Sequence, residues 1–532
     1  MTMILSCQKT EQKIIIFLCI MSFALFFGAC YEKKQPQKPP IKIQVQPIDN
    51  VYIHYSDDES IFRIGNGSIE RTIFLDKKSN HAFTTSFVNK LTKHNYINSL
   101  SEEFSLDINQ TQVSGITENL QYVKYEIYSI GAIKGLELDF KAKSESFGEI
   151  IIRVFYEIYS SNPAIRKWIE IENTSSSAIT VSNSLVERLN IMPGIIDDIS
   201  IHDLAEYLPN KGLVGMSPVI LNDNLMEGFI IGNEIPGVMK YYDLYSKPPQ
   251  IAIGMRKSGD PYALAIQIEP SETWACPAVF IFLFADDPSK SIKTFLDFVS
   301  DYITMNQWQN YNAWFEEISD QTTEDLLKDK INQAKNSNFD IFCLKGNWAD
   351  RRGDWTFENK PYIKNVSEYV HNLDMKFGLC IDFAMAEPDS FILNKYPELV
   401  LKPKDKPDYI IPDTNSKLMC LGSKYAVYMA YEISALVKEL ILDYVRLTGT
   451  MIPPPEIGAC FADDHIHTNY ASSLWSIYDG LFALITYLHS QHKDLIVDVS
   501  LEHYYPPGGL DYMLLKYADI STGIKIESLE EE

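Results

Sequence analysis

Positive charge is scarce in this chain of 532 residues, which carries 47 lysines and arginines against 71 aspartates and glutamates. With a formal net charge of −24, nothing would offset the repulsion of phosphates, so the composition argues against a nucleic-acid partner. Hydrophobic residues make up 46% of the chain and aromatic residues 12%, as in a packed globular protein. Because a chain of this length is too long to fold around a single hydrophobic core, we expect two or three domains.

Cysteines spaced for a disulfide framework or a zinc ribbon are also lacking. Three of the eight cysteines belong to the N-terminal segment. The other five follow at wide intervals: Cys276, Cys343, Cys380, Cys420 and Cys460. An odd number without a C-x-x-C pair indicates neither a disulfide framework nor a zinc ribbon. Cys343, Cys380 and Cys460 lie inside apolar runs, where we expect buried thiols.

The N-terminal segment has the pattern of an export signal. Lys9 and Lys13 form a basic region, and residues 14–27 form an apolar run that is short for a membrane span. Two small residues then precede Cys30, which resembles the signal of bacterial lipoproteins, in which this cysteine is lipidated. A plain secretory signal or an uncleaved anchor is the alternative.

This pattern predicts where the protein is found. We interpret residues 1–29 as a lipoprotein signal peptide and residues 30–49, rich in Lys, Gln and Pro, as a solvated tether. The mature protein would be held in the cell envelope by a lipid on Cys30, in the periplasm or on the outer-membrane surface. The membrane is therefore one expected partner.

Residues 50–285 have the pattern of a large β-sandwich, a supersandwich. Short alternating or apolar runs of strand length recur at residues 71–75, 121–128, 136–140, 149–159, 167–171 and 279–284. Turn residues separate these runs, and we find no convincing helix among them. A linking helix is expected within residues 286–304, after which the pattern changes.

In residues 305–532, strand-like runs alternate with helical patterns. The candidate strands are residues 312–315, 339–344, 377–383, 444–447, 457–461, 495–501 and 519–526. The candidate helices are residues 322–336, 366–373, 425–441 and 473–489. About seven β/α units predict a (β/α)8-type TIM barrel that is incomplete at its C-terminus. The predicted fold class is thus multidomain, a β-sandwich followed by an α/β barrel.

The stretch of residues 339–355 carries the first indication of a ligand. Its apolar strand ends at Lys345, and a polar loop with two tryptophans and two aspartates follows. Such a change is typical of the top of a β/α barrel. Trp348 and Trp355 offer flat apolar rings for sugars, and Asn347 and Asp354 offer partners for hydroxyl groups. An ordinary loop with a core tryptophan is the alternative.

Several short motifs follow one another in the order found in one family. In the sandwich region they are residues 64–71, Glu103-Phe104, residues 154–157 and residues 163–167. In the barrel region they are Trp348 with residues 353–355, residues 376–379 with Glu387-Pro388, residues 396–398, and Gly508-Gly509 with Asp511 to Asp519. Together with the order of sandwich, helix and barrel, they resemble melibiase-type α-galactosidases, glycoside hydrolase family 36 of clan D.

The resemblance implies retaining hydrolysis by two carboxylates, but the expected positions carry other residues. The family's nucleophile closes a K-W-D motif after the fourth strand, where this chain has Arg446, Leu447 and Thr448. Arg446 keeps a cationic group for sugar hydroxyls. The acid/base aspartate should follow Asp519, where residues 522–525 are Thr, Gly, Ile and Lys. On this alignment both catalytic aspartates are replaced.

The sugar-binding motifs of the family differ as well. The family's D-D-G-W, whose aspartates hold galactose, aligns with residues 345–348, Lys-Gly-Asn-Trp. The Cys and Arg of its glycine-rich segment are lost within residues 503–509. The resemblance is therefore stronger for fold and ancestry than for activity.

Other polar residues at predicted strand ends are candidates to replace the carboxylates. The candidates for catalysis are Asp463, Asp464, His465 and Glu502. The candidates for substrate binding are Lys345, Asn347, Trp348, Asp354, Trp355, Asp382, Arg446 and Tyr504. Glu502 with Asp463 or Asp464 would form a displaced carboxylate pair, and a wide separation would favour inversion.

Two further interpretations of these residues stay open. Lys345, His465 and Tyr504 would abstract a proton beside a uronate carboxyl neutralised by Arg446, which would make a lyase. Asp463, His465 and His467 would bind a divalent metal, although a polar loop without metal is the simpler reading, and no cofactor is otherwise expected.

The sequence therefore predicts a lipoprotein that hydrolyses glycan-derived oligosaccharides with an α-galactosidase-like body and a non-standard active site. The expected partner besides the membrane is an oligo- or polysaccharide. A lyase acting on acidic glycans and a glycan-binding protein without catalysis are the alternatives.

Overall fold

The computed structural model describes residues 51–97, 99–191, 199–203, 218–222, 227–244, 250–285, 288–304, 311–404, 407–412, 414–467, 469–500 and 511–521. The predicted signal peptide, the tether and Cys30 lie outside these ranges. Within them, none of the helices combines the length and the apolar character that crossing a bilayer requires.

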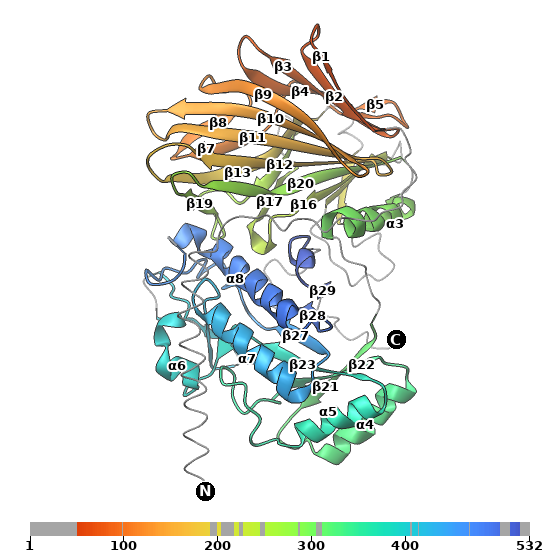
Figure 1. The fold of residues 1–532 in the computed structure, drawn as a ribbon, viewed down its shortest axis with the longest axis vertical. Coiled ribbons are helices and arrows are strands. Elements are labelled where there is room, and N and C mark those ends of the chain that lie inside the picture. Colours follow the sequence, from red (N-terminus) through yellow and green to blue (C-terminus); the bar gives the residue numbers. More distant parts are fainter. Residues whose placement is uncertain are drawn as a thin grey trace.

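The N-terminal half of the described chain is built from β-strands (Figure 1). The first strands are β1 (Tyr52–Ser56), β2 (Ile61–Gly65), β3 (Ile69–Asp76), β4 (His81–Asn89), β5 (His94–Asn95), β6 (Ser101–Glu102), β7 (Ser105–Ile108), β8 (Thr111–Ser114), β9 (Leu120–Ile130) and β10 (Ile133–Ser144). The next are β11 (Gly148–Tyr159), β12 (Ala164–Asn173), β13 (Ile179–Asn190), β14 (Ile199–Asp203), β15 (Pro218–Asn222), β16 (Glu227–Asn233), β17 (Lys240–Asp243), β18 (Gln250–Met255), β19 (Ala265–Ile268) and β20 (Thr273–Ala285). A short 3-10 helix, η2 (Gly237–Met239), precedes β17.

These strands form three antiparallel sheets that enclose one apolar interior. The largest sheet has the order β14-β15-β16-β20-β12-β11-β10-β9. A second has the order β17-β18-β13-β7-β8, with β19 also on β13, and a third has the order β1-β2-β3-β4-β5, with β6 on β4. In β3, buried and partly exposed residues alternate, as expected for a strand with one face on a core. The predicted large β-sandwich is therefore present.

Helix α3 (Pro288–Phe298) follows the last of these strands and continues into a wider helical turn, η3 (Val299–Thr304). Its aromatic residues Phe295 and Phe298 pack against Phe280 and Phe282 of β20. This burial of aromatic rings attaches the helix to the outer face of the largest sheet.

The C-terminal half contains one parallel sheet with helices between its strands. The strands are β21 (Ala313–Ile318), β22 (Ile341–Gly346), β23 (Lys376–Asp382), β27 (Tyr444–Thr448), β28 (Ile496–Val499) and β29 (Ile520–Ser521), adjacent in that order. The helices are α4 (Glu324–Asn336), α5 (Ile363–Asn372), α6 (Phe391–Lys395), α7 (Tyr425–Leu440) and α8 (Tyr470–Gln491), with the 3-10 turns η4 (Pro397–Leu399) and η5 (Leu514–Lys516). The described residues thus form a partial barrel.

One predicted strand is wrong. Residues 457–461 form turns and irregular chain between β27 and α8, without strand pairing. Three consecutive prolines, residues 453–455, lack the N–H groups that a ladder needs, and Gly458 has a positive φ of 72°. The run is apolar because Ala459 and Cys460 are buried, not because it belongs to the sheet.

Between β23 and α7, the chain adds a small sheet of three strands. They are β24 (Met385–Ala386), β25 (Ile410–Ile411) and β26 (Ser416–Leu418), in the order β24-β26-β25. This small sheet lies beyond the carboxyl end of β23, on the side where the loops of a β/α barrel form its sites.

The two halves pack directly against each other, the sandwich above the barrel in Figure 1. Trp274 of β20 meets Trp475 of α8 edge to face, with 6.2 Å between ring centroids. The Tyr262 hydroxyl donates to the Pro453 carbonyl at 3.0 Å. Lys516 also pairs with Glu234, whose side chain is fully buried. These contacts fix the β27–α8 connection, helix α8 and the turn η5 against the sandwich.

Candidate functional site

A cavity of about 1060 Å³ opens at the carboxyl ends of β21, β22, β23 and β27. Strand ends and the loops after them form one wall, and residues 409–414 with residues 449–454 form another. Its size lies at the upper end of the roughly 300–1,000 Å³ that is usual for small-molecule sites. The predicted site residues in its lining are Lys345, Asn347, Trp348, Trp355, Asp382 and Arg446.

A group that we call the cavity charge cluster, Arg352, Asp382 and Glu387, lies on the β23 side. Arg352 Nε donates to Asp382 Oδ2 at 2.8 Å, and its Nη1 donates to Glu387 Oε1 at 2.7 Å. Burial disfavours the charged guanidinium, but the two carboxylates outweigh it and raise the pKa of Arg352. The arginine thus fixes two carboxylates side by side in the cavity.

The carboxylate of Asp382 also reaches the neighbouring strand. Asp382 ends β23 and is paired in parallel register with Thr448, which ends β27. The Thr448 hydroxyl donates to Asp382 Oδ1 at 2.7 Å. Parallel strands end at the same edge of the sheet. The Asp382 carboxylate therefore lies beside Thr448.

Arg446 is held rigidly at the floor of the cavity. Its guanidinium lies over the Phe315 ring, 4.6 Å from the centroid, and its Nη2 donates to Ser500 Oγ at 2.7 Å. Its Nε lies 3.6 Å from Asp498 Oδ2. Asp498 also accepts from Tyr444, and burial, followed by this charge, raises the pKa of the Tyr444 hydroxyl. A cation at the floor is therefore built into the fold.

The two tryptophans of the β22 loop differ from the expected exposed sugar platforms. Trp348 is only 1% exposed, and its Nε1 donates to the Cys380 carbonyl at 2.7 Å. Its ring stacks on Trp355 with centroids 5.9 Å apart. Both rings are buried in the wall of the cavity, so the alternative of core tryptophans describes their packing. Lys345, beside Glu317 at 3.1 Å, is half exposed at the rim.

Asp354, another predicted binding residue, does not line the cavity. Its carboxylate accepts from the backbone N–H of Phe391 at 2.5 Å, at the first residue of α6. A carboxylate at a helix start satisfies a free donor and the helix dipole. Asp354 thus positions α6.

The predicted catalytic residues on the β27–α8 connection lie outside the cavity lining. Asp463 and Asp464 are exposed, and His465 is partly buried. They were expected at a strand end, but residues 457–461 are not a strand, so nothing directs them to the top of the sheet. Glu502 and Tyr504 lie outside the described residues.

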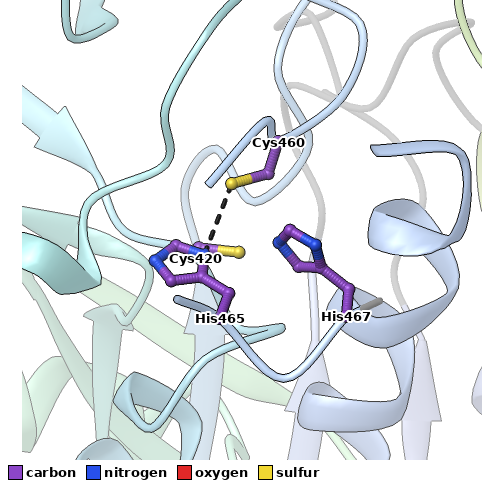
Figure 2. Close-up of side chains that lie close together, drawn as sticks. All are labelled: Cys420, Cys460, His465 and His467. Carbon is purple, nitrogen blue, oxygen red and sulfur yellow. Dashed lines mark hydrogen bonds between the residues drawn. The ribbon is translucent and has the colours of Figure 1, made fainter. Parts of the chain in front are cut away.

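The two histidines of this connection meet cysteines instead of aspartate. His465 and His467 lie with Cys420 and Cys460, and the potential ligand atoms of all four are within 4.8 Å of one another (Figure 2). Asp463 is not among them, which corrects the expected set of Asp463, His465 and His467. Cys420 lies 40 positions before Cys460, so short-range spacing gave no signal of this cluster.

The role of Arg352 in holding Asp382 and Glu387 was not predicted from the sequence. This residue stands within the stretch of residues 339–355, but nothing local indicates its partners, which follow it by 30 and 35 positions. Glu387 was noted only as part of a family motif. A basic residue in a loop at a strand end was the one available signal.

Comparison with known proteins shows what parts of this chain are similar to. Residues 279–519 match the family model described as Melibiase. α-Galactosidase Mel36A of Lactobacillus acidophilus is 24% identical over 180 residues, which cover 31% of this chain and 24% of that protein. The aligned part thus spans about a quarter of the curated relative's length.

Solved structures show the same fold. The α-galactosidase AgaB of Geobacillus stearothermophilus matches with a TM-score of 0.69 and 12% identity, covering 88% of this chain and 75% of that chain. A variant of AgaA from the same organism, in complex with stachyose, matches with a TM-score of 0.68 and 12% identity, covering 87% and 75%. Both are family 36 α-galactosidases, and the likeness extends over sandwich and barrel.

Proposed function

We propose that the chain, whose residues 279–519 match the melibiase family model and whose fold is shared with family 36 α-galactosidases, hydrolyses glycosidic bonds in α-galactoside-like oligosaccharides. The observation that carries the proposal is the cavity charge cluster beside Arg446, at the carboxyl ends of parallel strands. In β/α barrels this face carries the chemistry. The complex of AgaA with stachyose supports a saccharide as ligand.

We propose that Asp382 takes over the function of the carboxylate expected at Thr448. Hydrolysis with retention needs a nucleophilic carboxylate and an acid/base roughly 5–5.5 Å apart, and inversion needs a wider separation. Asp382 is the carboxylate that touches Thr448, and Arg352 balances its negative charge. Glu387, held by the same arginine, is our candidate for the second carboxylate.

Arg446 and Lys345 would bind and orient the sugar. Arg446 is already fixed by Phe315 and Ser500, so little conformational entropy is lost when it donates to hydroxyl groups. Lys345, with its partner Glu317, lies at the more exposed rim of the cavity. Together they would bind a saccharide between a rigid floor and a polar rim.

The place of action is part of the proposal. The signal-like segment before Cys30 supports export and lipidation, which would hold the enzyme in the cell envelope, in contact with imported or surface-bound glycans. Metabolic labelling with a fatty acid analogue would test this, since replacing Cys30 by Ser should abolish labelling.

A non-catalytic glycan-binding protein is the second candidate, favoured by Thr448 at the nucleophile position of the family. The lyase has less support. Of its residues, His465 lies outside the cavity lining and Tyr504 outside the described residues, which leaves Lys345 and Arg446.

The test is an activity panel with the full chain and an Asp382→Asn variant. Release of galactose or reducing sugar from p-nitrophenyl α-galactoside, raffinose and stachyose should be measurable, and the variant should lose about 10²–10⁴-fold in rate. Asp329→Asn on the exposed face of α4 is the matched control and should act like the wild type. Saccharide binding without any release would favour the binding protein, and an unsaturated product absorbing in the ultraviolet would favour the lyase.

A further inference from the structure

Four side chains with soft or imidazole ligand atoms converge away from the cavity (Figure 2). Cys420 lies two residues after the end of β26, whereas Cys460, His465 and His467 lie on the β27–α8 connection. All their potential ligand atoms lie within 4.8 Å of one another, and none of the four residues lines the cavity. We call this group the Cys/His cluster.

The hydrogen bond of His465 directs one ring nitrogen into the cluster. Its Nε2 lies 2.7 Å from the Glu398 carbonyl oxygen, which can only accept, so Nε2 carries the proton. In the neutral ring, Nδ1 is therefore unprotonated, and it lies 3.4 Å from Cys460 Sγ. Metal-binding histidines characteristically donate their other N–H to a backbone carbonyl in this way.

His467 supplies the second, independent observation. Its side chain is 5% exposed, and neither ring nitrogen has a hydrogen-bond partner among the described residues. A buried imidazole without partners is costly and rare in folded proteins. Because the ring faces the two thiols and His465 (Figure 2), a ligand within the cluster would satisfy it.

We propose that Cys420, Cys460, His465 and His467 bind one Zn²⁺ ion in a structural site. Zinc favours tetrahedral Cys₂His₂ coordination, with Zn–S near 2.3 Å and Zn–N near 2.0–2.1 Å, which places neighbouring ligand atoms roughly 3.3–3.8 Å apart. The 3.4 Å between Cys460 Sγ and His465 Nδ1 already fits one such edge. Four protein ligands leave no open position for water, so this zinc stabilises the fold and is not catalytic.

Binding would release the protons of two thiols to solvent and leave thiolates on the metal. The other pair of facing thiols in the described residues, Cys343 and Cys380 with 3.5 Å between sulfurs, belongs to no comparable ligand group. The two histidines therefore distinguish the Cys/His cluster from a pair of packed cysteines.

The zinc would join two segments that line the cavity. The segment before Cys420 contributes Tyr409, Ile411 and Thr414 to the lining, and the segment before Cys460 contributes Gly449, Thr450, Ile452 and Pro454. His467 also lies two residues before Asn469, the N-cap of α8. Metal binding would thus fix two segments of one cavity wall and the start of the longest helix described in the barrel half.

Metal analysis of the full chain tests the proposal. After gel filtration, the wild type should contain about one zinc per chain, and His467→Ala and Cys460→Ser should each lower zinc content about tenfold or more. Cys276→Ala removes a buried thiol of the sandwich and should keep the zinc. A wild type without zinc after growth and purification with added zinc salt would overturn the proposal.

Cobalt provides a readout that does not depend on the variants folding. After removal of bound metal, Co²⁺ added to the wild type should give the visible bands of tetrahedral cobalt and thiolate charge transfer in the near ultraviolet. Zinc should displace these bands, and melting temperature should fall in chelator and recover with zinc. Octahedral cobalt spectra, or a Cys420–Cys460 disulfide found by mass spectrometry of protein purified without reductant, would contradict the site.

Discussion

Arginine joins two carboxylates both inside the sandwich and in the cavity, with different access to water. In the sandwich charge cluster, Arg71 binds Glu103 at 2.9 Å and Glu187 at 2.5 Å, with Lys167 3.2 Å from both glutamates. All four side chains are 1–2% exposed. In the cavity charge cluster, Arg352 and its two carboxylates keep 22–29% exposure.

This difference separates charges that hold a fold from charges that can meet a ligand. Inside the sandwich, each ion already has protein partners in place of water, and none can turn to a new partner without large cost. In the cavity, the same ion types still contact solvent, which a sugar can replace. Substitutions in each of the two clusters test whether burial sets this difference.

The largest effect is expected from Arg71→Met in the sandwich. It leaves Glu103 and Glu187 buried with Lys167 alone, so the free energy of unfolding should fall by about 3–5 kcal/mol. Arg63→Met breaks an exposed ion pair with Glu59 and should change it by at most about 1 kcal/mol. Urea denaturation measures both. Equal effects of the two substitutions would mean that burial does not set the contribution of these charges.

Acid should weaken the contact between sandwich and barrel through Glu234. Burial disfavours its charge, but Arg166 and Lys516 outweigh burial and lower the pKa of Glu234 to about 2. Because this lies below the unfolded value of about 4.3, the stabilisation is complete above that pH and is lost as pH falls toward 2.

A Glu234→Gln variant reports this contribution. Its melting temperature should be well below that of the wild type at pH 6, and the gap should narrow as pH falls from about 4 toward 2. If the difference in melting temperature between the two proteins did not change with pH over this window, the charge of Glu234 would contribute nothing to stability. Glu269→Gln on the sandwich surface is the control and should show no gap.

A smaller effect on stability, but a clear effect on function, is expected for Arg352→Met. Because Asp382 and Glu387 reach solvent, the free energy of unfolding should change by about 1 kcal/mol or less. Without the cation that holds Asp382 and Glu387 in place, the two carboxylates would be misplaced, and kcat/KM should fall about 10–100-fold. An Arg352→Met chain that unfolds like Arg71→Met would remove the distinction between the two clusters.

Much of the fold could be predicted because local patterns determine it. Alternation along β3 and β12, and the helical period of α7, follow directly from which faces are buried. The run at residues 457–461 was misleading because a buried connection at the interface between sandwich and barrel is as apolar as a strand. Only the prolines before it indicated otherwise.

The sites were harder to predict because they join distant positions. Asp382 and Thr448 meet across 66 positions, through the parallel register of β23 and β27. Cys420 reaches the histidines only through the packing of the segment after β26 against the β27–α8 connection, where Ile466 N–H donates to the Gly422 carbonyl at 3.0 Å. Residue spacing alone carries no such information.

The most direct test of the proposed site is a crystal structure of the Asp382→Asn chain soaked with stachyose. We expect density for a sugar ring in the cavity, with hydroxyl groups within hydrogen-bond distance of Arg446 and with its scissile bond beside residue 382. Sugar density elsewhere on the molecule, with this cavity filled only by water, would contradict the proposal.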